Sequence, residues 1–290
     1  MPAISAEGIA CYLRRLGIPD PGQPSVAALF ALHRAHVERI PYEVIDIQLR
    51  RWTSVQPHHA VSRILRGRGG YCVQLNTAFS VLLAALGYQV TRHAAGVQAS
   101  AAAPAATADI APHMALSVQL EDGHWLVDVG LGDGLHEPLP ARPGPYQQGP
   151  FSYRLDRSET EPGGLRLEHD PRGSLAGIDI RLAPARQQDF LRWHHYLVSS
   201  PESRLVRALT VMHRNANSTD SLTGCLLRHV DSAGRSVREL GTQGEWFDAL
   251  ADIFAIQLTD LDSGTREALW NKVRAAHEVW LAYRAASRAS

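Results

Sequence analysis

Cys72 has the setting of a nucleophile. It follows a break that contains Gly67, Gly69 and Gly70, and it opens an apolar segment that we expect to be a helix over 72–86. Backbone N–H groups and the helix dipole at such a start stabilise a thiolate, which is the reactive form of cysteine. The alternative is a small buried apolar residue, the usual state of a free cysteine. Cys11 and Cys225 lack this setting, so we interpret them as structural.

A thiolate nucleophile works with a base, most often a histidine that a carboxylate orients. His113 begins one predicted strand, and Asp128 lies inside the next, where a carboxylate is costly unless it has a partner. With a two-residue turn at Asp122 and Gly123, Asp128 would face Ser117. It would then share a face of the sheet with His113, but at about 13 Å along the strand. The pattern therefore predicts a Cys–His–Asp site and leaves open how the histidine and the aspartate meet.

The elements around these residues change character along the chain. Ser5 and Ser25 are candidate N-caps of two helices that end near Gly17 and Pro41, and a third helix is predicted over 58–65. Strands are predicted at 88–92, 114–120, 125–129, 151–155, 165–168, 178–182, 205–212 and 221–230, with an Ala/Pro-rich loop at 98–112. Helices return at about 244–254 and 264–287. Helices followed by strands, without βαβ alternation, indicate the α+β class.

Composition excludes several other classes of protein. The 290 residues include 29 basic and 29 acidic side chains and are 45% hydrophobic, which argues against a disordered chain and against a nucleic-acid partner. No apolar stretch is long enough to span a membrane. The three cysteines are far apart and form no CxxC pair, so we expect reduced thiols and no metal site. Together with an N-terminus that lacks the apolar core of a signal peptide, this predicts a cytoplasmic protein.

Several segments resemble one enzyme family. The segment 68–76, RGGYCVQLN, resembles the RGGxC-x-E/Q-x-N motif of the arylamine N-acetyltransferases, and 39–43, RIPYE, resembles their IPFEN segment. The segments HMAL at 113–116 and VDVGLG at 127–132 resemble the family's histidine and aspartate segments. Together with SSPES at 199–203 and TG at 223–224, they keep the family's order from about residue 5 to 275.

The resemblance implies both a fold and a catalytic triad. The fold has three parts: a helical bundle over 1–87, a central antiparallel β-barrel-like domain over 88–204, and an α/β lid with an extended C-terminal helix over 205–290. In the implied triad, Cys72 is the nucleophile, His113 the base and Asp128 the orienting carboxylate. The long C-terminal helix could cover or narrow the acyl-donor cleft.

The resemblance also implies the reaction. The cysteine would take an acyl group from acetyl-CoA or another acyl-CoA, used as a co-substrate without any bound cofactor, and pass it to an arylamine, hydrazine or other small amine. Tyr42 and Leu131 would line the acceptor pocket, and Arg68 and Glu43 would brace the cysteine loop. Gly130 is a candidate for contact with CoA. Leu131 stands where the family usually has Phe, which leaves the selectivity for flat arylamines open.

Three alternatives remain at this point. The first is an amide synthase of the same family, which would take its acyl group from a carrier-protein thioester in natural-product assembly. The second is a transglutaminase-like cysteine hydrolase, since such enzymes also place a cysteine at a helix start before a histidine and an aspartate. The third is a binding protein with an inactive triad.

Overall fold

The computed structural model describes residues 4–110 and 112–289, and it has the α+β class expected from the sequence. The first part consists of helices and one short strand: α1 (Ala6–Leu16), α2 (Val26–Arg39), β1 (Tyr42–Glu43), α3 (Ile45–Gln48), α4 (Pro57–Leu65) and α5 (Cys72–Ala85). The predicted caps are present, because the hydroxyl of Ser5 accepts from the Gly8 N–H at 3.1 Å and that of Ser25 accepts from the Ala28 N–H at 3.2 Å. Both helices therefore begin directly after the serine whose side chain caps them.

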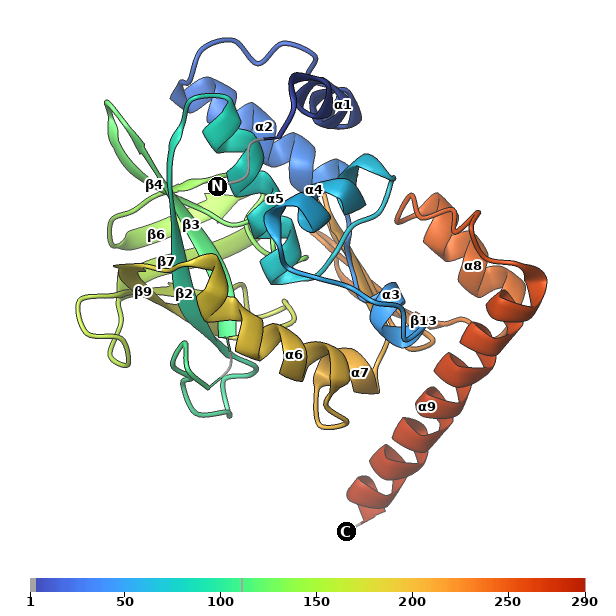
Figure 1. Cartoon of the computed structure of the whole chain (residues 1–290). Helices are drawn as coiled ribbons and strands as arrows, with labels where there is room; N and C mark the ends of the chain where they lie inside the picture. The colour runs from blue at the N-terminus through green and yellow to red at the C-terminus, as the bar shows by residue number, and fades with distance from the viewer. Residues whose placement is uncertain (1–3, 111, 290) are drawn as a thin grey trace.

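Helix α5 is the centre of this bundle. Every residue from Val73 to Leu83 is buried, so the helix is covered on all sides, as its apolar sequence requires. The other helices cover part of it, and strands β2 and β3 pack against another side (Figure 1). Its first residue, Cys72, remains partly accessible.

The second part is an antiparallel sheet of eight strands. Its spatial order is β5-β4-β3-β2-β9-β8-β7-β6. The bounds are β2 (Gln89–Gln98), β3 (Pro112–Leu120), β4 (Gly123–Val127), β5 (Leu139–Pro140), β6 (Gly144–Gln148), β7 (Phe151–Arg157), β8 (Leu165–Glu168) and β9 (Gly177–Pro184). The strongly bent sheet encloses an apolar core of its own (Figure 1).

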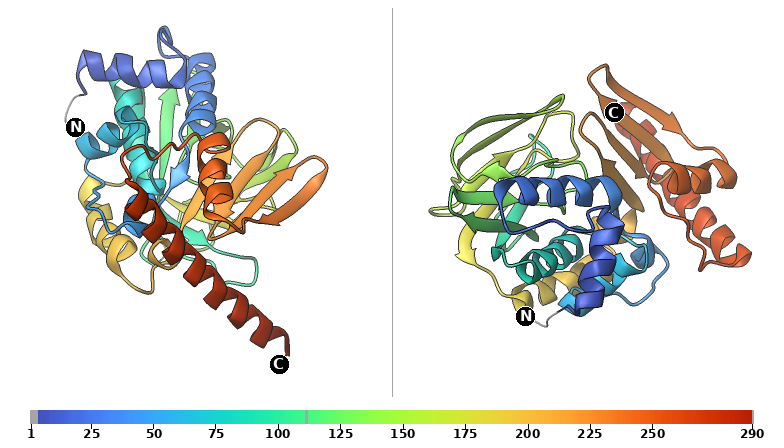
Figure 2. Two further views of the ribbon diagram at one scale, coloured as in Figure 1. Left: turned by 90° about the vertical axis from the view of Figure 1, so that its right-hand side faces the viewer. Right: turned by 90° about the horizontal axis from the view of Figure 1, so that it is seen from above.

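The chain then passes through short helices into a second sheet. These helices are η1 (Gln187–Phe190), α6 (Leu191–Ser199) and α7 (Arg204–Arg207). The sheet joins β1 to β10 (Thr210–Arg214), β11 (Thr219–Thr223), β12 (Leu226–Asp231) and β13 (Gly234–Glu239), all antiparallel. Helices α8 (Gln243–Asp252) and α9 (Ser263–Ala289) complete this part, which lies to one side of the bundle (Figure 2).

Three expectations from the sequence need correction here. The strand expected over 205–212 is helix α7 followed by β10, and the strand expected over 221–230 is two strands with a turn at Gly224. The first half of α9 packs against the second sheet, but its end extends away from the body, and its side chains from Glu278 to Ala286 are exposed (Figures 1 and 2). It therefore does not fold back over the rest of the chain. The three-part division at 87/88 and 204/205 stays a prediction.

No helix among residues 4–110 and 112–289 combines the length and the apolar character needed to cross a membrane.

Candidate active site

Cys72 is the first residue of α5, one position after the extended residue Tyr71. The sulfur therefore lies where the first N–H groups of the helix are unpaired and the dipole is positive. The loop before it is held by β1, since the Glu43 N–H donates to the Gly70 carbonyl at 3.0 Å. This arrangement fixes the backbone on both sides of the nucleophile.

His113 and Asp128 are in direct contact. The distance between His113 Nε2 and Asp128 Oδ2 is 2.6 Å, and both side chains are almost completely buried. Burial disfavours a charged imidazole, but the Asp128 carboxylate and the Cys72 sulfur outweigh it and raise the pKa of His113 to about 10. Because Nε2 is engaged with Asp128, Nδ1 is the ring nitrogen left for Cys72.

The hairpin register explains how the histidine and the aspartate meet. The structure pairs Leu120 with Gly123 and Leu116 with Val127, so the turn residues are Glu121 and Asp122. The register expected from the sequence was wrong, because it centred the turn one residue later. Asp128 consequently reaches the level of Ala115 and lies two residues from His113 along the strand, about 7 Å, which two side chains can bridge.

Asn76 completes the environment of Asp128, and sequence reasoning gave it no role. Its side-chain amide donates to Asp128 Oδ1 at 2.8 Å and accepts from the Val129 N–H at 3.0 Å. The Gly130 N–H also donates to Asp128 Oδ1, at 2.8 Å. The sequence did contain a signal that Asn76 lies at the site, since residues 72 and 76 are one helical turn apart and share a face of α5.

The segment after Asp128 passes directly beside Cys72 and Tyr42. A Cβ placed on Gly130 would lie 2.8 Å from Cys72 Cα, and one placed on Gly132 would lie 3.1 Å from Tyr42 Cβ. Only glycine allows the segment to pass this close to both residues, and at Gly132 the backbone also has φ +79°. Leu131, between them, is buried in the core of the eight-stranded sheet.

Helix α2 anchors the same segment from behind. His33 Nδ1 lies 3.0 Å from the His136 carbonyl oxygen, and His136 Nε2 lies 2.7 Å from Glu38 Oε1. Arg34 forms an ion pair with Glu137 at 2.8 Å. The bundle and the sheet therefore fix the Asp128 segment jointly.

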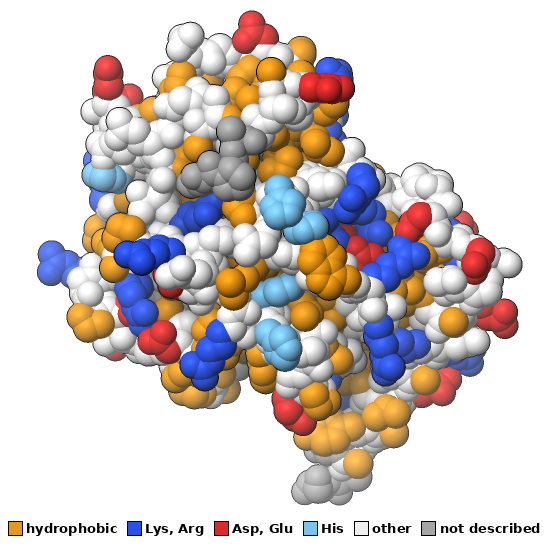
Figure 3. Space-filling model, in the orientation of Figure 1, with side chains coloured by type: hydrophobic (Ala, Val, Ile, Leu, Met, Phe, Trp, Pro, Cys, Tyr) orange, Lys and Arg blue, Asp and Glu red, His pale blue; other side chains and the backbone are white. Residues whose placement is uncertain are grey.

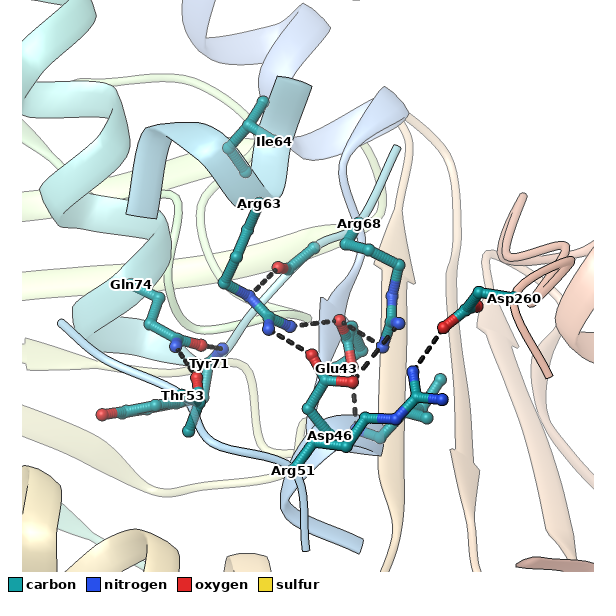
Figure 4. A network of polar contacts seen from close by, with 12 residues as sticks. Glu43, Asp46, Arg51, Thr53, Arg63, Ile64, Arg68, Tyr71, Gln74 and Asp260 are labelled. Carbon is teal, nitrogen blue, oxygen red and sulfur yellow. Dashed lines mark hydrogen bonds and ion pairs between the residues drawn. The ribbon is translucent and has the colours of Figure 1, made fainter. Parts of the chain in front are cut away.

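A network of charges lies on the other side of the cysteine loop (Figure 4). Glu43, fully buried, accepts from Arg63 at 2.7 Å and from Arg68 at 3.1 Å, and both arginines also contact Asp46. Burial alone would raise the pKa of Glu43, but the two guanidinium groups hold it below its usual value. Arg63 Nε donates to the Gly69 carbonyl at 3.0 Å, which ties the network to the loop.

Two members of this network, Arg63 and Asp46, escaped sequence reasoning. The signal for Arg63 was an arginine within the otherwise apolar side of α4, whose residues Ala60, Val61 and Ile64 are buried. At the edge of the network, Arg51 pairs with Asp260, so the network reaches the second sheet's part of the chain (Figure 4).

Tyr71 links the nucleophile to the segment between the two sheets. Its hydroxyl is 2.7 Å from Nδ1 of His194 on α6, and His194 Nε2 is 3.0 Å from the Thr53 carbonyl oxygen. Gln74, in the first turn of α5, contacts the hydroxyl of Thr53 at 2.5 Å. These contacts join α6 and the 53–54 segment to the residues at the start of α5.

The remaining cysteines stand apart from these groups. Cys225 is buried, and burial raises its pKa to about 11, so that it is a poor nucleophile. Cys11 accepts a hydrogen bond from Arg14 on the surface of α1. Among the residues that the structure describes, no three His, Cys, Asp or Glu side chains are arranged to hold a metal ion.

Comparison with known proteins gives consistent matches. A family model described as N-acetyltransferase matches residues 25–262. The chain is 30% identical over 262 residues to an arylamine N-acetyltransferase of Mycolicibacterium smegmatis, covering 86% of this chain and 92% of that protein. A structure of the Mycobacterium marinum arylamine N-acetyltransferase in complex with CoA aligns with a TM-score of 0.79 at 26% identity, covering 92% of this chain and 99% of the other. The chain is also 34% identical over 157 residues to the proansamycin X synthase of Amycolatopsis mediterranei, covering 52% of this chain and 59% of that protein.

Proposed function

Because the chain belongs to the arylamine N-acetyltransferase family, and is thus an acyltransferase that moves an acyl group from a CoA thioester to an amine, we propose that Cys72, His113 and Asp128 perform the transfer. The observation that carries this proposal is the buried His113–Asp128 contact of 2.6 Å beside a cysteine at a helix start. These are the parts that nucleophilic catalysis by a thiolate needs.

The first half-reaction loads the enzyme. The Cys72 thiolate attacks the carbonyl carbon of the acyl thioester, a new C–S bond forms, and the bond to the CoA sulfur breaks. The leaving thiolate takes the proton that His113 holds. Asp128 keeps the imidazole in one orientation and stabilises its charged form until that transfer.

The second half-reaction transfers the acyl group from the enzyme to the amine. An amine attacks the Cys72 thioester, His113 takes a proton from the nitrogen, and the bond between carbon and the Cys72 sulfur breaks. The cysteine leaves as a thiolate beside an imidazolium, which is the state from which the cycle began. Arylamines are weakly basic and therefore enter as neutral nucleophiles at pH 7.

We assign the supporting roles in the same way. Glu43 and Arg68 brace the cysteine loop, because both belong to the charge network that reaches Gly69. Tyr42 forms a wall for the acceptor, Leu131 supports that wall from the core of the eight-stranded sheet, and Gly130, which lies against Cys72, faces the donor. An acyl-CoA is a co-substrate rather than a resident cofactor, and a cytoplasmic site of action fits both its supply and the reduced cysteines.

The test is the intact mass of the protein after incubation with acetyl-CoA and without any amine. We expect one added acetyl group on the wild type and none on Cys72→Ala. Cys225→Ala is the matched control and should gain the group as the wild type does. An acetylated Cys72→Ala variant, or an unmodified wild type, would contradict the proposed acyl-enzyme.

A second candidate is the amide synthase reaction, which the similarity to proansamycin X synthase favours. In that case the donor would be an acyl group on a carrier protein, and the chemistry at Cys72 would be unchanged. Loading from an acyl carrier-protein thioester, with no loading from acetyl-CoA or longer acyl-CoAs, would select this candidate. Cleavage of peptides without any thioester donor would instead indicate a hydrolase.

A further inference from the structure

Tyrosine hydroxyls inside this protein are hydrogen-bonded, with one exception in the site. The bonded ones are Tyr12 to His36, Tyr71 to His194, Tyr88 to Ser25, Tyr146 to the Arg142 carbonyl and Tyr153 to the Gly134 carbonyl. In the described part of the chain, the hydroxyl of the half-buried Tyr42 has no hydrogen-bond partner. A hydroxyl in a partly desolvated place without a protein partner is available to a bound molecule.

Strand geometry places Tyr42 on the substrate side of β1. Successive side chains of a strand point to opposite faces, and Glu43 points into the charge network. Tyr42 therefore points the other way, and its Cβ indeed lies beside Gly132. The same residue is bridged to Gly70, two positions before the nucleophile.

Tyr42 and Cys72 contact one segment at positions two residues apart. Gly130 lies against Cys72, and Gly132 lies against Tyr42. An acceptor whose amine attacks the Cys72 thioester therefore has Tyr42 within reach of its remote end.

The charges around Tyr42 suit an oxygen-bearing group. Burial raises the pKa of Tyr42, as does the nearby Cys72 sulfur, whereas Arg204 lowers it, so the hydroxyl is a neutral donor at ordinary pH. Arg204 is exposed on α7 and adds a positive charge near the hydroxyl. Asp133 is also near, but its carboxylate already accepts from the N–H and the hydroxyl of Ser174.

We propose that the Tyr42 hydroxyl selects acceptors, by donating a hydrogen bond to an oxygen substituent, a phenolic hydroxyl or a carboxylate, that the amine carries away from its nitrogen. This inference rests on the proposed function, since it takes the Cys72 thioester as the group under attack. When an acceptor carries no oxygen substituent, the Tyr42 hydroxyl stays without a hydrogen-bond partner, and the site therefore disfavours that acceptor. Selection therefore acts in the second half-reaction and leaves loading of the enzyme unchanged.

The test compares the full-length Tyr42→Phe variant with the wild type in the two half-reactions separately. Loading is followed as the gain of one acetyl group from acetyl-CoA, and unloading as its transfer to aniline, 4-aminophenol or 4-aminobenzoate. We expect transfer to the two substituted amines to fall about tenfold further than transfer to aniline does, the size of one hydrogen bond, whereas a change in the wall alone would slow all three amines equally. Taking each variant rate relative to the wild type removes the different intrinsic reactivity of the three amines.

Tyr196→Phe is the matched control, because Tyr196 is exposed on α6, and it should change none of the rates. An equal loss with all three amines, a slower loading step, or no loss at all would overturn the inference. Failure of the proposed function has a different signature, since the wild type would then take up no acetyl group; that result would overturn both.

Discussion

Asp128 and Glu43 are two buried carboxylates that lie on different sides of one cysteine loop, and their partners separate their roles. Asp128 accepts from His113, which can gain and lose a proton, and from the neutral groups of Asn76 and Gly130. Glu43 accepts from Arg63 and Arg68, which stay charged, and from the Ile45 N–H. Asp128 can therefore stabilise a partner that is charged in one step of a reaction and neutral in the next. Glu43, in contrast, keeps partners that are charged throughout.

Burial alone therefore does not distinguish a carboxylate that would orient a base from one that braces a loop. Both carboxylates are shielded from water, and both satisfy their lone pairs within the protein. The difference is whether the partner's charge can change at the pH of the reaction. Three experiments sharpen this contrast.

The largest effect is expected from Asp128→Asn. The amide has the same size but cannot hold the imidazole in the required state, so kcat/KM should fall about a thousand- to ten-thousandfold. The melting temperature should fall as well, because the buried imidazolium loses its carboxylate, so kcat/KM is compared per folded protein. Asp156→Asn, on an exposed carboxylate of β7, is the control and should leave both quantities unchanged. A rate within tenfold of the wild type would remove Asp128 from the triad.

Glu43→Gln should act on stability instead. The substitution leaves two buried guanidinium groups with Asp46 as their one remaining carboxylate, which costs about 3–5 kcal/mol in the free energy of unfolding. Urea denaturation measures this loss, with Glu267→Gln on the exposed side of α9 as the control. The pH profile of kcat/KM in the folded fraction should keep its shape. A loss below about 1 kcal/mol would mean that the network is not a brace.

The smallest effect is a difference in how pH changes the stability that His113 and Glu43 each contribute. The pKa of His113 is raised from 6.5 to about 10, so its contribution to stability is complete below pH 6.5 and is lost as the pH rises through about 10. The pKa of Glu43 is lowered from 4.5, so its contribution is complete above pH 4.5 and is lost only in acid.

Melting temperatures between pH 6 and 10 can show this. The advantage of the wild type over His113→Gln should shrink across that range, whereas its advantage over Glu43→Gln should stay constant. Parallel behaviour of the two variants would mean that the His113–Asp128 pair does not titrate there.

The class of fold was predicted from the sequence and is confirmed, and the residues of the proposed triad were named from it too, because both depend on local signals. The Ser5 and Ser25 caps, the glycine break before Cys72 and the alternating strands are read within a few residues. The register of the 112–127 hairpin was missed because two turn positions fit the same residues, and only packing of the sheet decides between them.

Contacts between segments that are distant along the chain could not be predicted from the sequence. The links from Asn76 to Asp128, from Tyr71 to His194 and from Arg51 to Asp260 each join residues more than 50 positions apart. Polar residues such as these look like ordinary surface residues until the fold brings their partners to them. Helix α6 was also not predicted, since none of its residues is fully buried and the sequence there has no strong core-facing stripe.

The projecting end of α9 is accessible to proteases. Hydrophobic side chains gather on it at the edge of the molecule (Figure 3), and Val279, Trp280, Leu281 and Tyr283 are exposed there. Beyond His277 the helix keeps its backbone hydrogen bonds without a core beneath them, and an isolated helical segment of this length is marginal in water. Transient fraying should therefore begin at this end. Trypsin should cleave after Arg284 long before it reaches Arg63, and the protein trimmed in this way should keep its triad intact.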